Sequence, residues 1–250
     1  MESEKEMGAT KQGDSPQQPG GEASAEEILR EAKLQKSSQA LLLIAVLGII
    51  AVVGFFAVLQ NLKPEAPKTV DELHQLNIDG KLPRGQGLLY RGFSFVYLNG
   101  LWHTQSIGPN TSNVYSLYFH YLPTELEGIP IEGALNRTIF EEYPGVYVTF
   151  NPLGTNLQYV ALAVSKFDQT LTKAFGKLPI AACDRNETEA CKTRKIITCN
   201  NTDSPVLYID QQDTPLVRFK DNCIMVQGKE DNIVKAMERL LYLLYGIMTR

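Results

Sequence analysis

The hydrophobic pattern of the chain is dominated by one uninterrupted apolar run. Residues 40–59 read ALLLIAVLGIIAVVGFFAVL and contain only Ala, Val, Ile, Leu, Phe and Gly. A helix rises about 1.5 Å per residue, so about twenty residues cross a hydrocarbon core of about 30 Å. Backbone groups in lipid have to be paired within the segment, which a helix achieves. We therefore predict a transmembrane helix over residues 40–59.

Two other interpretations of this run fit less well. A buried core helix normally carries polar positions on some part of its surface, and this run has none. A cleavable signal peptide has a shorter apolar core near the N-terminus and a small-residue cleavage site, whereas Gln60-Asn61-Leu62-Lys63 follows this run. The second long apolar stretch, Ile233–Met248, is interrupted by charged residues and is typical of a soluble amphipathic helix. We expect a single-pass signal anchor.

The charges, cysteines and glycosylation motifs indicate an orientation. Basic residues precede the run at Arg30, Lys33 and Lys36 and follow it at Lys63 and Lys68. This slight excess favours a cytoplasmic N-terminus. All the cysteines follow the run: Cys183, Cys191, Cys199 and Cys223. So do all the Asn-x-Ser/Thr motifs, which are candidate glycosylation sites at Asn110, Asn136, Asn186 and Asn200. We therefore expect a cell-membrane protein with its C-terminal domain outside.

The chain divides into five predicted segments. Residues 1–23 are rich in Glu, Gln, Gly, Ser and Pro, which predicts a disordered cytoplasmic tail. A capping box at Ser24–Glu27 begins a predicted juxtamembrane helix over 24–39. The transmembrane helix over 40–59 and a Pro-containing linker over 60–69 follow. Residues 70–250 form the extracytoplasmic domain, whose first helix is predicted from the Thr69-x-x-Glu72 pattern.

The first half of this domain has the pattern of strands. Apolar residues alternate at Phe93, Phe95 and Tyr97, and Asn99-Gly100 then supplies a two-residue type I′ turn. Residues 101–104 return from that turn, and residues 114–122 form another candidate strand. Residues 123–145 have the Pro and Gly content of a loop.

The second half repeats a strand followed by a helix. A strand over 146–150 precedes a helix that ends at Gly176, and a strand over 223–226 precedes a helix over 230–247. Apolar residues recur in both helices at alternating steps of three and four. Short strands are predicted over 195–199, 206–209 and 216–219. The predicted fold class is α+β: a mainly antiparallel sheet with helices packed on one face, stabilised by disulfides.

Part of this pattern resembles a known group of proteins. The segment Asn222–Met248, with Trp102-His103-Thr104 and Phe119–Pro123 upstream, resembles uncharacterised single-span membrane proteins of archaea that have an exterior domain. The resemblance covers most of residues 85–250. It implies the membrane topology and no catalytic activity.

The cysteines have the spacing C-x7-C-x7-C-x23-C. A structural zinc site usually has two cysteines two to four residues apart, and a thioredoxin-type site has C-x-x-C, so neither pattern is present. An even number of cysteines outside the membrane predicts disulfides. Three pairings are possible, and we favour Cys183–Cys191 with Cys199–Cys223. The bridged basic loop is either a solvated loop or a recognition surface, and we favour the solvated loop.

The remaining candidates for chemistry are two histidines. His103 and His120 lie on predicted neighbouring strands, where they could act near Glu125 or Glu127. No nucleophile elbow, metalloprotease motif or phosphate-binding loop accompanies them, so we favour a structural role for both. We expect no catalytic residue, cofactor or metal. The net charge of −4 argues against a nucleic-acid partner.

These observations favour binding or assembly at the cell envelope, without catalysis. The expected partners are the lipid bilayer and an envelope protein. Two alternatives stay open: an envelope-anchored hydrolase with an unfamiliar site, and an accessory subunit of a membrane transport or secretion complex.

Overall fold

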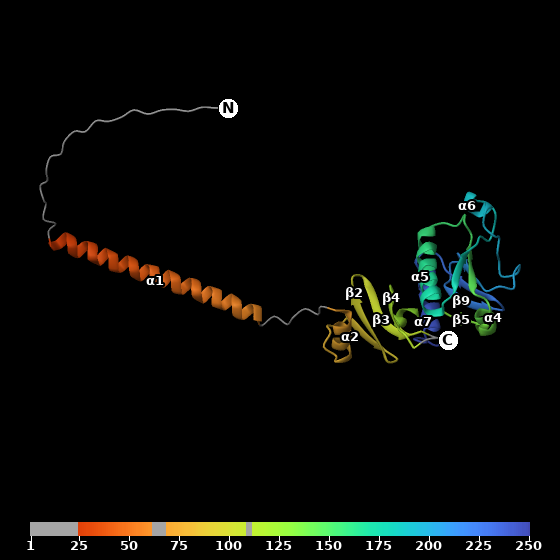
Figure 1. The fold of residues 1–250 in the computed structure, drawn as a ribbon, viewed down its shortest axis with the longest axis horizontal. Coiled ribbons are helices and arrows are strands. Elements are labelled where there is room, and N and C mark those ends of the chain that lie inside the picture. Colours follow the sequence, from red (N-terminus) through yellow and green to blue (C-terminus); the bar gives the residue numbers. More distant parts are fainter. Residues whose placement is uncertain (1–24, 62–68, 109–111) are drawn as a thin grey trace, which may run out of the picture. The chain divides into compact units, whose positions relative to one another are not determined.

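A computed structural model of the protein describes residues 25–61, 69–108 and 112–250, with side chains in the first segment described over 41–59 (Figure 1). The predictions for the tail over 1–23, the cap at Ser24 and most of the linker over 60–69 lie outside the described residues. The chain divides into two units, Met1–Ala66 and Pro67–Arg250.

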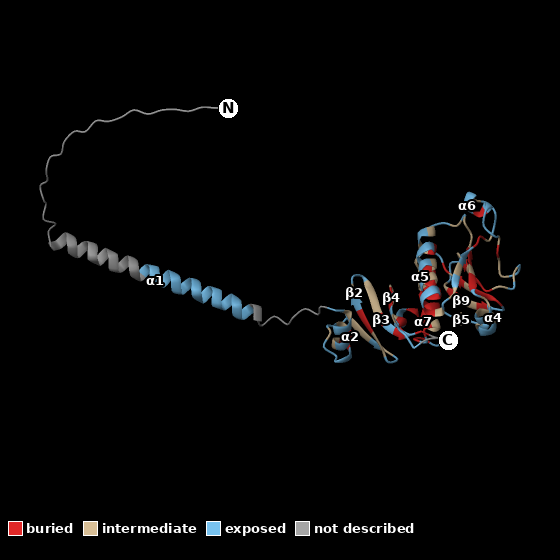
Figure 2. Ribbon diagram, in the orientation of Figure 1, coloured by how far each residue is buried: buried red, intermediate tan, exposed pale blue. Residues whose placement is uncertain are grey.

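Helix α1 (Ala25–Asn61) joins the predicted juxtamembrane and transmembrane segments in one continuous helix. Within it, Leu41–Leu59 is long and apolar enough to cross a membrane. None of this stretch is buried, as the uniform exposed colour in Figure 2 shows. By its length and composition, this stretch is a candidate membrane anchor.

The second unit begins with a four-stranded antiparallel sheet. Its strands are β1 (Gly87–Tyr90), β2 (Phe93–Leu98), β3 (Leu101–Ile107) and β4 (Val114–Phe119), in that spatial order. The turn between β2 and β3 has positive φ at Asn99 (53°) and Gly100 (84°), which confirms the predicted type I′ turn. Strand β1 was not predicted. Helix α2 (Val70–Ile78) begins with the predicted capping box at Thr69 and packs on β2.

The second sheet has six strands in the order β5-β9-β10-β8-β6-β7. They are β5 (Ile131–Glu132), β6 (Gly145–Phe150), β7 (Leu178–Ala181), β8 (Val206–Asp210), β9 (Leu216–Lys220) and β10 (Cys223–Gln227). The β9–β10 pairing is antiparallel, but β5–β9, β10–β8, β8–β6 and β6–β7 are parallel. A mainly antiparallel sheet therefore describes the first sheet, while the second is mixed. Helix α5 connects β6 to β7 and returns the chain in the same direction, which makes these two neighbours parallel.

Two sequence predictions need correction. Residues 195–199 form no strand, because Ile196 makes only an isolated bridge to Cys183. Residues 123–145 are more than a loop, since they contain α3 (Pro123–Leu126), β5 and α4 (Arg137–Glu142). Asn136 caps α4 by accepting a hydrogen bond from the Ile139 N–H. Both helices are a few residues long, so neither displays a hydrophobic period.

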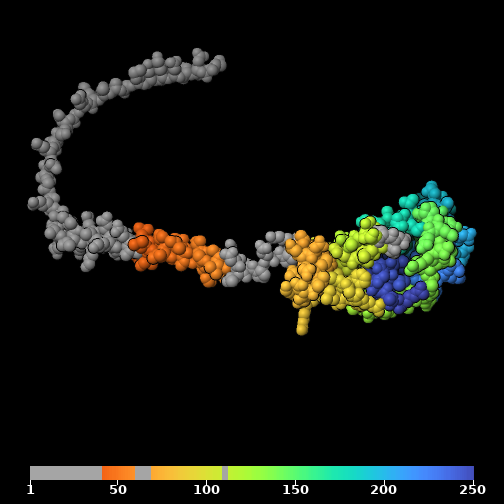
Figure 3. Space-filling view, turned by 60° about the horizontal axis from the view of Figure 1, so that its bottom comes forward, coloured from red at the N-terminus to blue at the C-terminus, as the bar shows by residue number. Residues whose placement is uncertain are grey.

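Helices α5 (Leu157–Phe175) and α7 (Asp231–Leu244) contact each other and share the core with the inner face of the second sheet. The α5 helix ends at Gly176 in the left-handed conformation, as predicted. Helix α7 also contacts the first sheet, where the Tyr242 ring meets Phe95 edge to face and lies at a tilt over Phe119. In Figure 3 the dark-blue C-terminal residues lie between yellow residues of the first sheet and green residues of the second-sheet region.

This central position of α7 changes the interpretation of its polar residues. A soluble amphipathic helix over 233–248 predicts that its charged residues Glu238 and Arg239 face solvent. In the structure the exposed fraction is 0% for Glu238 and 4% for Arg239. The first sheet covers the side of α7 that faces away from the second sheet. A buried carboxylate requires protein partners, and these define the candidate site.

Candidate functional site

A groove runs between the edge strand β4 and helix α5. It has a volume of about 320 Å³, and it is lined by residues from β4, by three turns of α5, and by Leu241 on α7 with the C-cap residue Tyr245. Its lining is Leu101, Tyr115, Ser116, Leu117, Tyr118, Phe119, His120, Leu162, Ser165, Lys166, Gln169, Thr170, Lys173, Leu241 and Tyr245. The groove follows β4 from Tyr115 to Phe119, so its shape suits an elongated ligand.

The open side of β4 presents backbone hydrogen-bonding groups to this groove. Lys166 Nζ donates to the Tyr118 carbonyl, and the His120 N–H donates to Glu238, so both groups point away from β3. In an antiparallel strand, residues two apart point their backbone groups to the same side. Ser116 and Val114 therefore also point toward the open edge. The register pairs Ser116 with Gln105 and Tyr118 with His103, so the Ser116 N–H and C=O face the groove as the Tyr118 carbonyl does.

Glu238 holds the end of this strand edge. Its carboxylate accepts hydrogen bonds from the backbone N–H groups of His120 (2.9 and 3.0 Å) and Tyr121 (3.0 Å). The Nδ1 atom of His120 and Nζ of Lys166 each lie 2.9 Å from Glu238 Oε1. Charge-assisted bonds of this kind offset the loss of hydration of a buried carboxylate. This cluster ties β4, α5 and α7 together at one end of the groove.

A tyrosine pair extends the cluster. The Tyr242 hydroxyl donates to the Tyr121 carbonyl at 2.6 Å, and the Tyr121 hydroxyl donates to Asp231. Burial raises the pKa of both tyrosines above their usual range. For Asp231, burial opposes ionisation, but hydrogen bonds from Lys235 and Tyr121 lower the pKa overall. These groups keep fixed protonation states near neutral pH, which suits a structural role.

The predicted histidines have different surroundings. His120 lies at the groove, but its carboxylate partner is Glu238 and not Glu125 or Glu127. Glu125 instead caps α3 by accepting from the Leu122 N–H, and Glu127 accepts from the Tyr90 hydroxyl. His120 and Glu238 are 118 positions apart, so no local motif signals their contact.

His103 lies on the face of the first sheet that is turned away from α7 and toward α2. Its Nε2 is 3.1 Å from the Leu98 carbonyl oxygen, and its ring meets that of Tyr118 edge to face. Sequence reasoning did not single out His74 on α2, which is buried. Its Nδ1 lies 2.9 Å from Ser94 Oγ, while Nε2 is buried without a hydrogen-bond partner. Burial is the main reason that the pKa of His74 is lowered.

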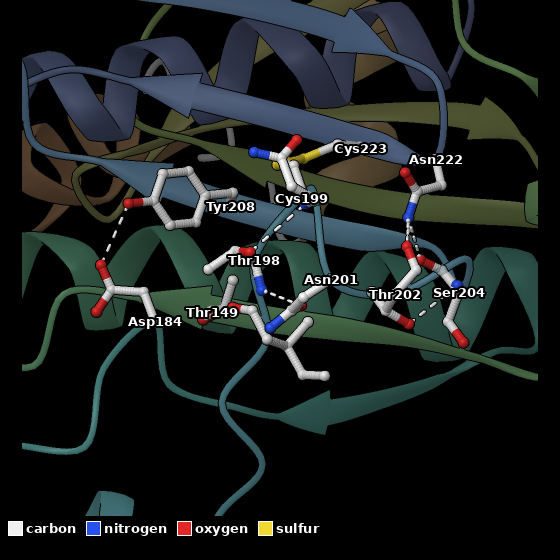
Figure 4. Close-up of a disulfide and its surroundings, with 12 residues drawn as sticks. Thr149, Asp184, Thr198, Cys199, Asn201, Thr202, Ser204, Tyr208, Asn222 and Cys223 are labelled. Carbon is white, nitrogen blue, oxygen red and sulfur yellow. Dashed lines mark hydrogen bonds between the residues drawn. A yellow bond between two sulfur atoms is a disulfide. The ribbon is translucent and has the colours of Figure 1, made fainter.

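The cysteines form the pairs that sequence reasoning favoured. Cys183 is bonded to Cys191 and Cys199 to Cys223, with Cα atoms 5.8 and 5.4 Å apart. The second bridge fastens the segment over 182–204 to β10, on the outer face of the six-stranded sheet (Figure 4). Cys223 belongs to a small apolar cluster with Ala182, Ile197 and Val206 between this segment and the sheet.

Hydrogen bonds around this bridge hold the covering segment in place. Asn222 donates to the carbonyls of Thr202 and Ser204 at 2.8 and 2.7 Å (Figure 4). The Tyr208 hydroxyl donates to Asp184 at 3.2 Å, and burial raises the pKa of Tyr208 to about 12. The region therefore acts as a packed cover for the sheet.

The basic residues of the bridged loop do not converge. Arg185 pairs with Asp184, Lys192 pairs with Glu189, and Lys195 lies over the Tyr147 ring. Two of these are exposed pairs within the loop itself. This arrangement agrees with the solvated loop that the sequence favoured.

The candidate glycosylation sites have surface positions. Asn136, Asn186 and Asn200 are exposed, and Asn110 lies outside the described residues.

Across the described parts of the chain, no group of three or more His, Cys, Asp or Glu side chains is arranged to hold a metal ion. No family model, curated protein or solved structure matches the chain.

Proposed function

We propose that this is a single-pass membrane-anchored binding protein whose extracytoplasmic domain takes up an extended segment of an envelope protein partner along β4. The groove between β4 and α5 is the observation that carries the proposal. The role is binding or assembly, without catalysis. If the partner belongs to a transport or secretion complex, the protein is an accessory subunit of that complex.

The anchor and compartment are supported by three independent features. Leu41–Leu59 exposes apolar side chains all round, which suits lipid. Two disulfides in the domain suit an oxidising compartment. The described Asn-x-Ser/Thr motifs all have exposed asparagines. Together with the basic residues before the apolar run, they support a cytoplasmic N-terminus and an exterior C-terminal domain.

The peptide partner is supported by the chemistry of the groove. An extended segment adds to an open strand edge through backbone hydrogen bonds, and side-chain pockets then supply specificity. Tyr118 and Leu162 offer partly exposed apolar surface beside the open edge. Lys173 makes no ion pair within the described residues, whereas Lys166 is paired with Glu238. The groove therefore favours a segment with apolar residues and an acidic group near Lys173.

Selection from a random peptide library on the immobilised full chain tests this proposal. Enriched peptides should contain an acidic residue and should lose binding to Ser116→Pro, which removes an outward N–H without removing a β3–β4 hydrogen bond. Lys173→Glu should also weaken binding of these peptides, whereas Lys192→Glu, at an exposed position away from the groove, should not. Fluorescence of Trp102, the single tryptophan, checks that each variant is folded. Failure to enrich peptides, or enrichment insensitive to Ser116→Pro, contradicts the proposal.

Topology is tested separately by labelling thiols in intact cells with a membrane-impermeant maleimide. Cysteines of an exterior, disulfide-bonded domain should label only after reduction. Labelling that requires cell lysis but no reduction would place the domain in the cytoplasm with free thiols, and would overturn the envelope assignment.

A hydrolase is the second candidate, because His120 lines the groove while the buried Glu238 holds its Nδ1. A carboxylate in this position orients a catalytic histidine in hydrolases. Ser116 and Ser165 line the same groove, although neither forms a hydrogen bond with His120 in the described structure. A hydrolase panel tests this candidate: turnover by the parent that His120→Asn abolishes, with the Trp102 signal unchanged, would favour the enzyme.

A further inference from the structure

A second cavity lies on another side of α5 and has no role in the proposed peptide groove. It has a volume of about 200 Å³ and shares only Thr170 with that groove. It forms where α4 and Leu135 meet the ends of α5 and α7. Its deepest lining comes from Phe167, Leu171, Phe219 and Ile224, all of which are buried.

The interior of this cavity is suited to an apolar body. An engineered apolar cavity of about 150 Å³ stays dry and takes up benzene, so 200 Å³ accommodates a body of about eight carbon atoms. Leu135, Phe140 and Phe175 are half-buried and extend the apolar lining toward the surface. A polar molecule would lose hydration there without recovering enough hydrogen bonds.

The charges around the cavity are mostly positive. Arg137, Lys177 and Arg250 contribute to its lining, and Glu141 is the one acidic residue that does. Lys177 donates to the carbonyls of Tyr143 (2.6 Å) and Glu141 (3.3 Å), so it holds the end of α4. Arg137 is exposed and forms no hydrogen bond or ion pair within the described residues. Its guanidinium is available to an anion, and this group binds carboxylates in a bidentate manner.

We propose that this cavity binds a small monocarboxylate with an aromatic or short aliphatic body, whose carboxylate is held by Arg137. The apolar interior accepts the body, and the basic residues select the anion. The site is independent of the peptide groove, because its ligand contacts α4 and the far face of α5.

The test uses three probes that share one body and differ in charge: 4-(trifluoromethyl)benzoate, the corresponding benzyl alcohol and the corresponding benzylamine. Binding to the full chain in lipid nanodiscs is followed by fluorine NMR, with empty nanodiscs measuring partition into lipid. The carboxylate should bind more tightly than the alcohol, and the amine should bind least.

Two variants separate the contributions of charge and cavity. Arg137→Glu should weaken binding of the carboxylate about tenfold and leave binding of the alcohol unchanged. The control is Arg194→Glu, at an exposed position on the disulfide-bonded segment, which should change the binding of neither probe. Leu135→Phe should weaken all three probes by narrowing the cavity. Equal binding of the three probes, binding no greater than to empty nanodiscs, or equal effects of the two arginine variants would overturn the proposal. None of these results bears on peptide selection at β4.

Discussion

Glu238 Oε1 and Lys166 Nζ lie 2.9 Å apart, joining α7 to α5 beneath the open edge of the first sheet. The side chain of Glu238 is fully buried, and that of Lys166 is 13% exposed. The same lysine donates to the Tyr118 carbonyl, so one side chain connects the buried carboxylate with the strand edge. The stability of the interface between the two sheets and the form of the groove therefore depend on the same pair.

Removing the carboxylate should destabilise the protein strongly. Glu238→Ala leaves two backbone N–H groups and a mostly buried ammonium without their acceptor, so we expect the free energy of unfolding to fall by about 3 kcal/mol. The matched control is Glu189→Ala, which breaks the exposed pair with Lys192. It should change the free energy of unfolding by about 0.5 kcal/mol or less. Urea unfolding of the full chain in detergent, followed by Trp102 fluorescence, measures both. Similar losses in the two variants would contradict the structural role of Glu238.

Gly133 should not tolerate a side chain. Its φ is +73°, and a Cβ atom there would lie 2.1 Å from the Phe219 carbonyl oxygen. Strain in the left-handed region and this clash predict that Gly133→Ala lowers the free energy of unfolding by at least about 2 kcal/mol. Gly128→Ala is the control, because a Cβ there meets nothing within 4 Å. Urea midpoints compare the pair, and equal midpoints would exclude close packing of the chain after β5 against β9.

The two disulfides should contribute unequally to stability. Loop-closure entropy predicts a loss of about 3.5 kcal/mol for Cys199→Ser with Cys223→Ser, and about 2.6 kcal/mol for Cys183→Ser with Cys191→Ser. The first pair also fastens the cover of the second sheet to β10. Thermal unfolding of the two double variants under oxidising conditions checks the order. The reverse order would mean that the loop closed by Cys183–Cys191 contributes more than its length predicts.

His74 should make the domain less stable in mild acid. Burial lowers the pKa of His74 below its ordinary value of 6.5, with Asp71 acting in the opposite direction and His103 in the same direction. Below pH 6.5 the unfolded chain binds a proton that the folded chain resists, so the free energy of unfolding decreases as the pH falls. Urea unfolding between pH 7.5 and about 5.5 should show this slope.

His74→Asn should reduce that slope, since it removes the titrating ring. Ser94→Ala serves as the control, because it removes the contact with His74 Nδ1 but keeps the buried ring, so the slope should persist. An unchanged slope in His74→Asn would assign the pH dependence to other groups.

The sequence by itself determined the features that depend on neighbours a few residues apart. The apolar run over 40–59 predicts a helix long and apolar enough to cross a membrane, which the structure has over Leu41–Leu59. Asn99-Gly100 specifies its turn by allowing positive φ at both positions. The caps at Thr69 and Gly176 and the apolar periods of α5 and α7 have the same local origin. The favoured cysteine pairing also agrees with the structure, because each bridge closes a short stretch of chain.

Only the tertiary structure decided which surfaces are covered. The period of α7 indicated one apolar face, but it could not show that the first sheet buries Glu238 on the other face. That burial depends on contacts such as His120–Glu238, between residues 118 positions apart. Strand order, the parallel pairings of the second sheet and both cavities have the same long-range origin. A sequence period reports which side of an element is apolar, whereas packing between distant elements determines which polar groups lose their water.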